Sequence, residues 1–173
     1  MIFEQEGLKA IAELAHEEKT GARGLMTVCE RLFRNFKYEL PATDVTMFVV
    51  NRELADHPAD VLERLLADPG FRQRSVGRYI LSRYAAQFLE QTEIELEFAE
   101  DAIDALCDKA VGTGDELFGV ALTMFHDYEH GLSLVRRNTG KASFVITRDV
   151  VDNPDGVLSA WIRESYTEQE PTA

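Results

Sequence analysis

The spacing of apolar residues predicts two amphipathic helices at the start of the chain. Over residues 4–18, apolar side chains recur at intervals of three and four, which places them on one helical face. They are Leu8, Ile11, Ala12 and Ala15. A second helix should start after Thr20, a good N-cap residue, and end at Pro41. We expect its inward side to comprise Leu25, Val28, Cys29, Leu32 and Phe36.

A strand and a short helix are expected next. Residues 45–50 are rich in β-branched side chains, which favours a strand. A helix over residues 59–67 should stop at the Asp68-Pro69-Gly70 run.

The second half of the chain repeats this order of elements. Residues 3–11 align with residues 98–106, and residues 48–58 align with residues 144–154. After a two-residue deletion, Lys19-Thr20-Gly21 aligns with Gly112-Thr113-Gly114. The polar, Pro- and Gly-containing segment 68–75 is the expected boundary between the two copies.

The second copy has additional elements in front of it. A helix over residues 76–91 and an alternating strand over residues 94–98 are predicted. The inward residues of that helix should be Tyr79, Ile80, Tyr84 and Phe88. Further core residues expected in the second copy are Phe118, Ala121, Leu122 and Phe125. The fold class is therefore α+β and mainly helical, with helices packed on a short β-sheet in each copy.

Composition excludes several classes of function. With 45% apolar and 28% charged residues the chain should fold, apart from a polar tail at residues 168–173 that is expected to be disordered. A net charge of −13 argues against non-specific binding to nucleic acid or an anionic membrane. No apolar run is long enough to span a membrane, and the cytoplasm is the expected location. Cys29 and Cys107 are expected to be core residues.

Charge distinguishes the two copies. Residues 19–37 contain five basic residues and one acid, whereas the aligned residues 112–130 contain four acids and no lysine or arginine. Glu116 aligns with Arg23, and its carboxylate would repel a phosphate. The second copy is thus either a docking surface for a basic patch on a neighbour or simply a solvated acidic face.

The run Lys19-Thr20-Gly21-Ala22-Arg23-Gly24-Leu25, followed by Tyr38-Glu39-Leu40-Pro41 and a strand, resembles the small C-terminal (lid, D2-small) domain of ClpX-like, Clp-type AAA+ ATPases. In that family the Gly-Ala-Arg segment is the sensor 2 motif. The resemblance implies two tandem lid-like domains. Residues 1–68 would form the first, without its leading helix, and residues 74–167 a second, degenerate one. We expect the chain to be a piece of a longer protein.

The implied function is that of a lid in an ATP-dependent protein unfoldase or chaperone. Arg23 would contact the nucleotide, because a guanidinium in the first turn of a helix adds to the orphan N–H groups there, and Gly21 and Ala22 would shape the turn. No phosphate-binding loop is present, so the chain should carry no catalytic residue, and ATP and Mg²⁺ would bind the large AAA+ domain. The implied partners are that large domain, neighbouring subunits of a hexameric ring and, where one exists, a Clp-type peptidase.

Two alternatives remain open at this point. The chain could be a stand-alone protein-interaction module that never meets nucleotide. It could instead be a zinc enzyme, since His126-Asp127-Tyr128-Glu129-His130 matches an H-x-x-E-H pattern. Against zinc, Gly131 should end the helix and residues 133–152 read as loop and strand, with no third ligand helix.

Overall fold

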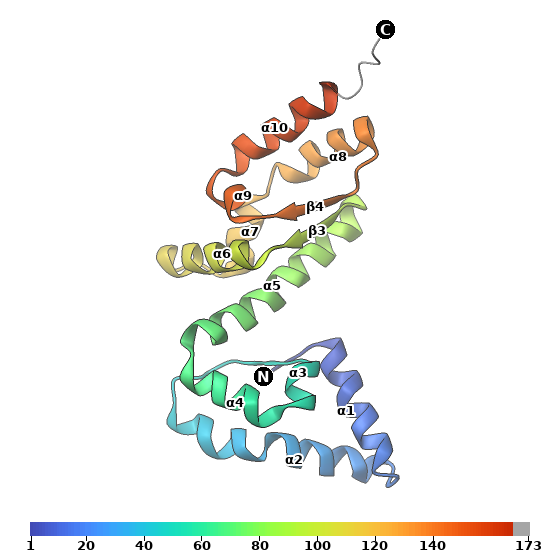
Figure 1. Ribbon diagram of the computed structural model, residues 1–173, viewed down its shortest axis with the longest axis vertical. Helices are drawn as coiled ribbons and strands as arrows, with labels where there is room; N and C mark the ends of the chain where they lie inside the picture. The colour runs from blue at the N-terminus through green and yellow to red at the C-terminus, as the bar shows by residue number, and fades with distance from the viewer. Residues whose placement is uncertain (168–173) are drawn as a thin grey trace. The chain divides into compact units, whose positions relative to one another are not determined.

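The structure contains two pairs of parallel strands, and Figure 1 labels the second pair. The computed structural model describes residues 1–167, and the predicted disordered tail, residues 168–173, lies outside the described residues. The chain divides into two compact units, one over Met1–Val76 and the other from Gly77 onward. The α+β, mainly helical class predicted from the sequence is confirmed.

The first unit brings its N-terminal strand beside a strand that follows two long helices. Its elements are β1 (Ile2–Phe3), α1 (Gln5–Glu17), α2 (Ala22–Glu39), a 3₁₀ turn (Leu40–Ala42), β2 (Val49–Val50), α3 (Arg52–Asp56) and α4 (Pro58–Ala67). Helices α1 and α2 pack on each other, and α3 packs on α1. The buried side chains between them, Val28, Leu32, Phe36, Val50 and Leu54 among others, form one hydrophobic core.

The second unit resembles the first in its order of elements, but a helix precedes its first strand. Helix α5 (Pro69–Thr92) crosses the division between the units and leads into β3 (Glu95–Phe98). The remaining elements are α6 (Glu100–Thr113), α7 (Leu117–Met124), α8 (Tyr128–Thr139), β4 (Ser143–Ile146), α9 (Arg148–Asp152) and α10 (Pro154–Thr167). Helices α7 and α8 together occupy the place of α2. Helices α8 and α10 pack side by side, as the orange and red ribbons of Figure 1 show.

Strand register is the same in the two units at aligned positions. Phe3 lies opposite Val50 in the first pair, and the aligned Phe98 lies opposite Ile146 in the second. The amide after each first strand donates to the carbonyl of that partner residue, at 3.0 Å from Glu4 to Val50 and 2.9 Å from Ala99 to Ile146.

The junction between the last two helices of each unit is also the same. His57 precedes α4 with φ −133° and ψ 61°, and the aligned Asn153 precedes α10 with φ −141° and ψ 67°. The shared bend places Pro58 and Pro154 at the first position of a helix, where a missing N–H costs nothing.

Several element boundaries differ from the prediction. The expected boundary segment, residues 68–75, is mostly helical because α5 starts at Pro69. Gly131 does not end a helix: α8 continues to Thr139, and Gly140, with φ 76°, is the left-handed cap. Only Val49–Val50 of the expected strand 45–50 pairs as a strand. The five-residue helices α3 and α9 were not predicted.

Most expected core residues are buried, but four predicted inward side chains are exposed. Val28, Leu32, Phe36, Ala121 and Phe125 are buried, and Phe118 packs partly buried against the second core. The exposed ones are Leu8, Ala12, Leu25 and Leu122. Helical spacing identifies an apolar face but does not tell which residues of it another element covers. Within residues 1–167, no helix has the length and apolar composition needed to cross a membrane.

Candidate functional site

The loop between α1 and α2 turns sharply through two residues with positive φ. Lys19 has φ 53° and Gly21 has φ 59° with ψ −136°. The second conformation is one that a residue with a Cβ atom rarely adopts, so glycine is required at position 21. Gly21 is the N-cap of α2, and its carbonyl accepts from Gly24 N–H at 3.0 Å, which closes the first turn.

Gly24 fixes the start of α2 against the end of α1. It is buried, and a Cβ atom built there would lie 2.7 Å from the carbonyl oxygen of Ala15 and 3.1 Å from Oγ1 of Thr20. A larger residue would push the two helices apart. The close contact therefore sets the direction in which the N-terminus of α2 points.

The N-terminus of α2 is suited to an anion. In the part of the chain that the structure describes, no side chain caps it, and its first turn contains no acidic residue, so no carboxylate of the first turn offsets the helix dipole at this end. Arg23, at the second position of the helix, is exposed, and within residues 1–167 it makes no ion pair. Arg31, by contrast, is paired with Glu18 at 2.9 Å. The cation at the start of the helix is thus available to a ligand.

A shallow, open depression of about 760 Å³ adjoins this N-terminus. Apolar and polar groups share it; the lining residues are Ala12, Ala15, His16, Glu17, Lys19, Gly21 and Leu25. Of the three predicted site residues, Gly21 lines the depression, while Ala22 and Arg23 begin the adjoining helix.

The aligned region of the second unit is built differently. Gly114 caps α6 in the left-handed conformation, with φ 75°, and α7 does not begin until Leu117. Glu116 is therefore the N-cap of α7, before the helix, whereas the aligned Arg23 lies inside the first turn of α2. A carboxylate at this end replaces the guanidinium.

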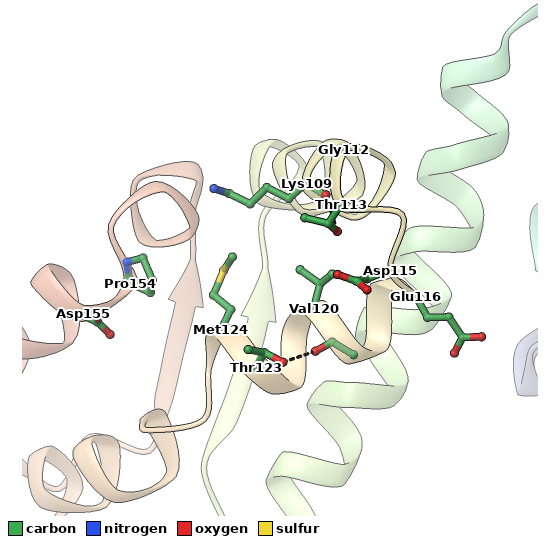
Figure 2. A pocket seen from close by; sticks show the side chains of 11 residues that line it. Lys109, Gly112, Thr113, Asp115, Glu116, Val120, Thr123, Met124, Pro154 and Asp155 are labelled. Carbon is green, nitrogen blue, oxygen red and sulfur yellow. Dashed lines mark hydrogen bonds between the residues drawn. The ribbon is translucent and has the colours of Figure 1, made fainter.

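An open depression of about 900 Å³ lies between the end of α6 and α7 in this unit. Figure 2 shows Val120 and Met124 pointing into the space below Lys109, and Glu116 pointing away from it. The Thr123 hydroxyl donates a hydrogen bond to the carbonyl oxygen of Gly119 at 3.0 Å, so its proton is engaged within α7 (Figure 2).

The H-x-x-E-H residues do not share one helical face. His126 lies in the turn that separates α7 from α8, whereas Glu129 and His130 lie in the first turn of α8, and all three are exposed. In residues 1–167, no group of three His, Cys, Asp or Glu side chains is placed to hold a metal ion. Tyr128, in the middle of the pattern, is instead a buried core residue.

Sequence reasoning missed the backbone geometry around the candidate residues. Lysine is not a residue type that indicates a positive φ, so the backbone conformation of Lys19 could not be predicted. The close contact of Gly24 with Ala15 depends on how α1 and α2 pack. Leu117, which aligns with Gly24, is a large buried residue, so the alignment of the two copies did not indicate that position 24 must be small.

Comparison with known proteins gives a partial relationship. No family model matches the chain, and no solved structure matches it. The ATP-dependent clpX-like chaperone, mitochondrial, of Saccharomyces cerevisiae is 36% identical over 52 residues, which are 30% of this chain and 10% of that chaperone. This chain therefore spans about a tenth of the length of the curated relative. Part of the chain is thus related in sequence to a ClpX-like chaperone, which makes a Clp-type AAA+ relationship the starting point for its function.

Proposed function

We propose that the two units are tandem copies of the small C-terminal domain of a Clp-type AAA+ ATPase, and that the first copy senses bound nucleotide through Arg23. The observation that carries the proposal is the N-terminus of α2, which has an exposed arginine and no acid in its first turn, and which no side chain of the described residues 1–167 caps. The sequence similarity to a ClpX-like chaperone supports the same assignment.

These residues suit one part of a nucleotide site. A guanidinium and free backbone N–H groups can bind a phosphate oxygen through charge-assisted hydrogen bonds. Bound ATP supplies the negatively charged phosphates, and Arg23 stabilises and positions them. Magnesium ligands and the residues that activate water belong, in this proposal, to a large AAA+ domain. The chain's part in protein unfolding then depends on that domain, on neighbouring subunits of a ring and on a Clp-type peptidase where one is present.

The test is the ATPase activity of a protein that joins this chain to its large AAA+ domain. Arg23→Ala should lower kcat, or weaken nucleotide binding, by roughly tenfold or more, the size expected for loss of one charge-assisted contact. Arg34→Ala is the matched control, since Arg34 is also exposed on α2 but lies three turns further along. Equal kinetics for both variants would contradict the sensor role and leave a nucleotide-independent interaction module as the better account.

A further inference from the structure

Aligned positions of the two units differ in burial on one face. Leu8 is 52% exposed, whereas the aligned Ile103 is 2% exposed. Ala12 is exposed, whereas the aligned Cys107 is buried. Positions that point into the core do not differ in this way: Ile11 and Leu106, for example, are buried in both units.

In the second unit, helix α5 covers this face. A Cβ atom built on Gly77 would overlap Sγ of Cys107 and lie 3.5 Å from Cγ2 of Ile103, so the helix backbone lies directly against α6. One end of the face is covered by Tyr84, whose ring centre is 6.2 Å from that of Phe98 and 5.9 Å from that of Phe118. Residues 77–88 of α5 thus bury a continuous apolar surface.

In the first unit the aligned surface is open. Phe3 and Leu25 align with Phe98 and Phe118, and they are 41% and 47% exposed. We call these residues and their neighbours the apolar face: Phe3, Leu8, Ala12 and Leu25. Within residues 1–167 none of these four side chains is buried, although all lie on elements that match those beneath α5.

The charges beside the apolar face differ from those beneath α5. Arg78 of α5 donates to both carboxylate oxygens of Glu100, at 2.7 and 2.6 Å. Gln5 aligns with Glu100, and Lys9, one turn later, aligns with Asp104. An arginine placed over the first unit would therefore meet the neutral amide of Gln5 and the ammonium of Lys9, which is paired with Glu6 at 2.7 Å. It would find no counterpart of the Glu100 carboxylate, so an acidic residue next to Lys9 is favoured in its place.

We infer that the apolar face binds an amphipathic helix of a partner polypeptide. The helix carries a small residue and, seven positions later, an aromatic residue, as Gly77 and Tyr84 do in α5, with an acid in place of Arg78. The small residue lets the helix backbone approach α1 closely, and the aromatic residue covers Phe3 and Leu25. This docking does not depend on the nucleotide role of Arg23.

The experiment uses the whole chain and a labelled peptide of residues 77–92 that carries Arg78→Glu. Fluorescence anisotropy should show saturable binding. Leu8→Glu and Leu25→Glu should each weaken it by roughly tenfold or more, because each replaces a leucine that the helix would bury with a charged side chain. Val111→Glu is the matched control, since Val111 is an exposed apolar residue of α6 outside the apolar face.

Charge gives an independent readout. The peptide that retains Arg78 should bind the unaltered chain about two- to fivefold more weakly than the Arg78→Glu peptide, as expected for exposed charge pairs. The double variant Gln5→Glu, Lys9→Asp should reverse that order. A Ser82→Ala peptide, altered on the exposed side of the helix, should bind as its parent does.

If the peptide in trans binds too weakly to measure, it is fused before Met1 through a Gly/Ser linker, which raises its effective concentration. Methyl NMR signals of Leu8 and Leu25 should then shift, and Tyr84→Ala in the fused segment should cancel the shift. Unshifted methyl signals in the fused protein, or binding that Leu8→Glu and Leu25→Glu leave unchanged, would overturn the inference.

Discussion

The hydroxyl of Tyr128 donates a 2.8 Å hydrogen bond to the carbonyl oxygen of Pro154 and so joins the start of α8 to the start of α10. The ring is buried, and it packs edge-on against Phe125 and Trp161, with centroid distances of 5.0 and 6.2 Å. Tyr128 therefore has a structural role at the centre of the H-x-x-E-H pattern.

Removing this hydrogen bond should destabilise the second unit. Tyr128→Phe keeps the ring but leaves the Pro154 carbonyl without its partner, at a cost of about 1–2 kcal/mol. Urea unfolding followed by the fluorescence of Trp161, the one tryptophan of the chain, reports on this unit. His126→Ala and His130→Ala, at exposed positions of the same pattern, should leave the midpoint within experimental error. A zinc-dependent midpoint would contradict the structural role.

Alkaline pH should destabilise the second unit. Burial, with a smaller contribution from the charge of Glu129, raises the pKa of Tyr84 to about 12, and burial also raises the pKa of Tyr128. The folded state then keeps these protons more tightly than the unfolded state does. The resulting stabilisation is complete below the unfolded pKa of about 10 and is lost as the pH rises toward 12.

The measurement is the urea midpoint of Trp161 fluorescence between pH 8 and pH 12. Tyr84→Phe should flatten the fall above about pH 10. Tyr166→Phe is a suitable control, because Tyr166 is exposed. A midpoint that is constant up to pH 12 in the unaltered chain would count against the buried phenols as the cause.

The two cysteines should differ in reactivity. Burial, with the nearby charges of Asp104 and Asp108, raises the pKa of Cys107 to about 11, while Cys29 is only half-buried. A thiol reagent at pH 8 should therefore modify Cys29 readily and Cys107 only after unfolding. Cys29→Ala should leave almost no fast-reacting thiol in the native chain. Equal rates for the two thiols would show that the region around Cys107 opens often.

Gly7 is a further sensitive position. A Cβ atom there would overlap the carbonyl oxygen of Val50 and approach Cα of Asn51 to 3.0 Å. Both are backbone atoms, so Gly7→Ala should force β2 away from α1 and destabilise the first unit by more than 1 kcal/mol, within the roughly 1–3 kcal/mol range of overpacked sites. Amide exchange at Val49 and Val50 measures the effect. The aligned Ala102 is buried without such a clash, so Ala102→Gly provides the comparison.

The sequence predicted the helices well where their apolar spacing was long and regular. The helix expected between Thr20 and Pro41 is α2, Ala22–Glu39. The aligned segments also contain strands: β2 follows Phe48 directly, and β4 includes Phe144. Helices α3 and α9 were missed because five residues are too few to show a helical period.

Errors arose where one residue type serves two purposes. Gly131 suggested a helix end, but a Cβ atom there would lie 2.7–3.0 Å from the side chain of Leu158, so this glycine allows α8 and α10 to pack closely. Leu25 was expected in the core because its spacing is helical, but it is exposed. Its burial would require another element to cover that side of α2. Neither distinction can be made from one sequence, because both are set by tertiary contacts.

The pairing of β1 with β2 has a consequence for synthesis on the ribosome. The first strand ends at Phe3, but its partner starts only at Val49, so the sheet of the first unit cannot form until both long helices have emerged. The same holds for β3 and β4. Early in translation, α1 and α2 can form a local helical hairpin, whereas strand pairing must wait for a distant segment. Each unit should therefore complete its fold late, after its second strand and the two helices that follow it have left the exit tunnel.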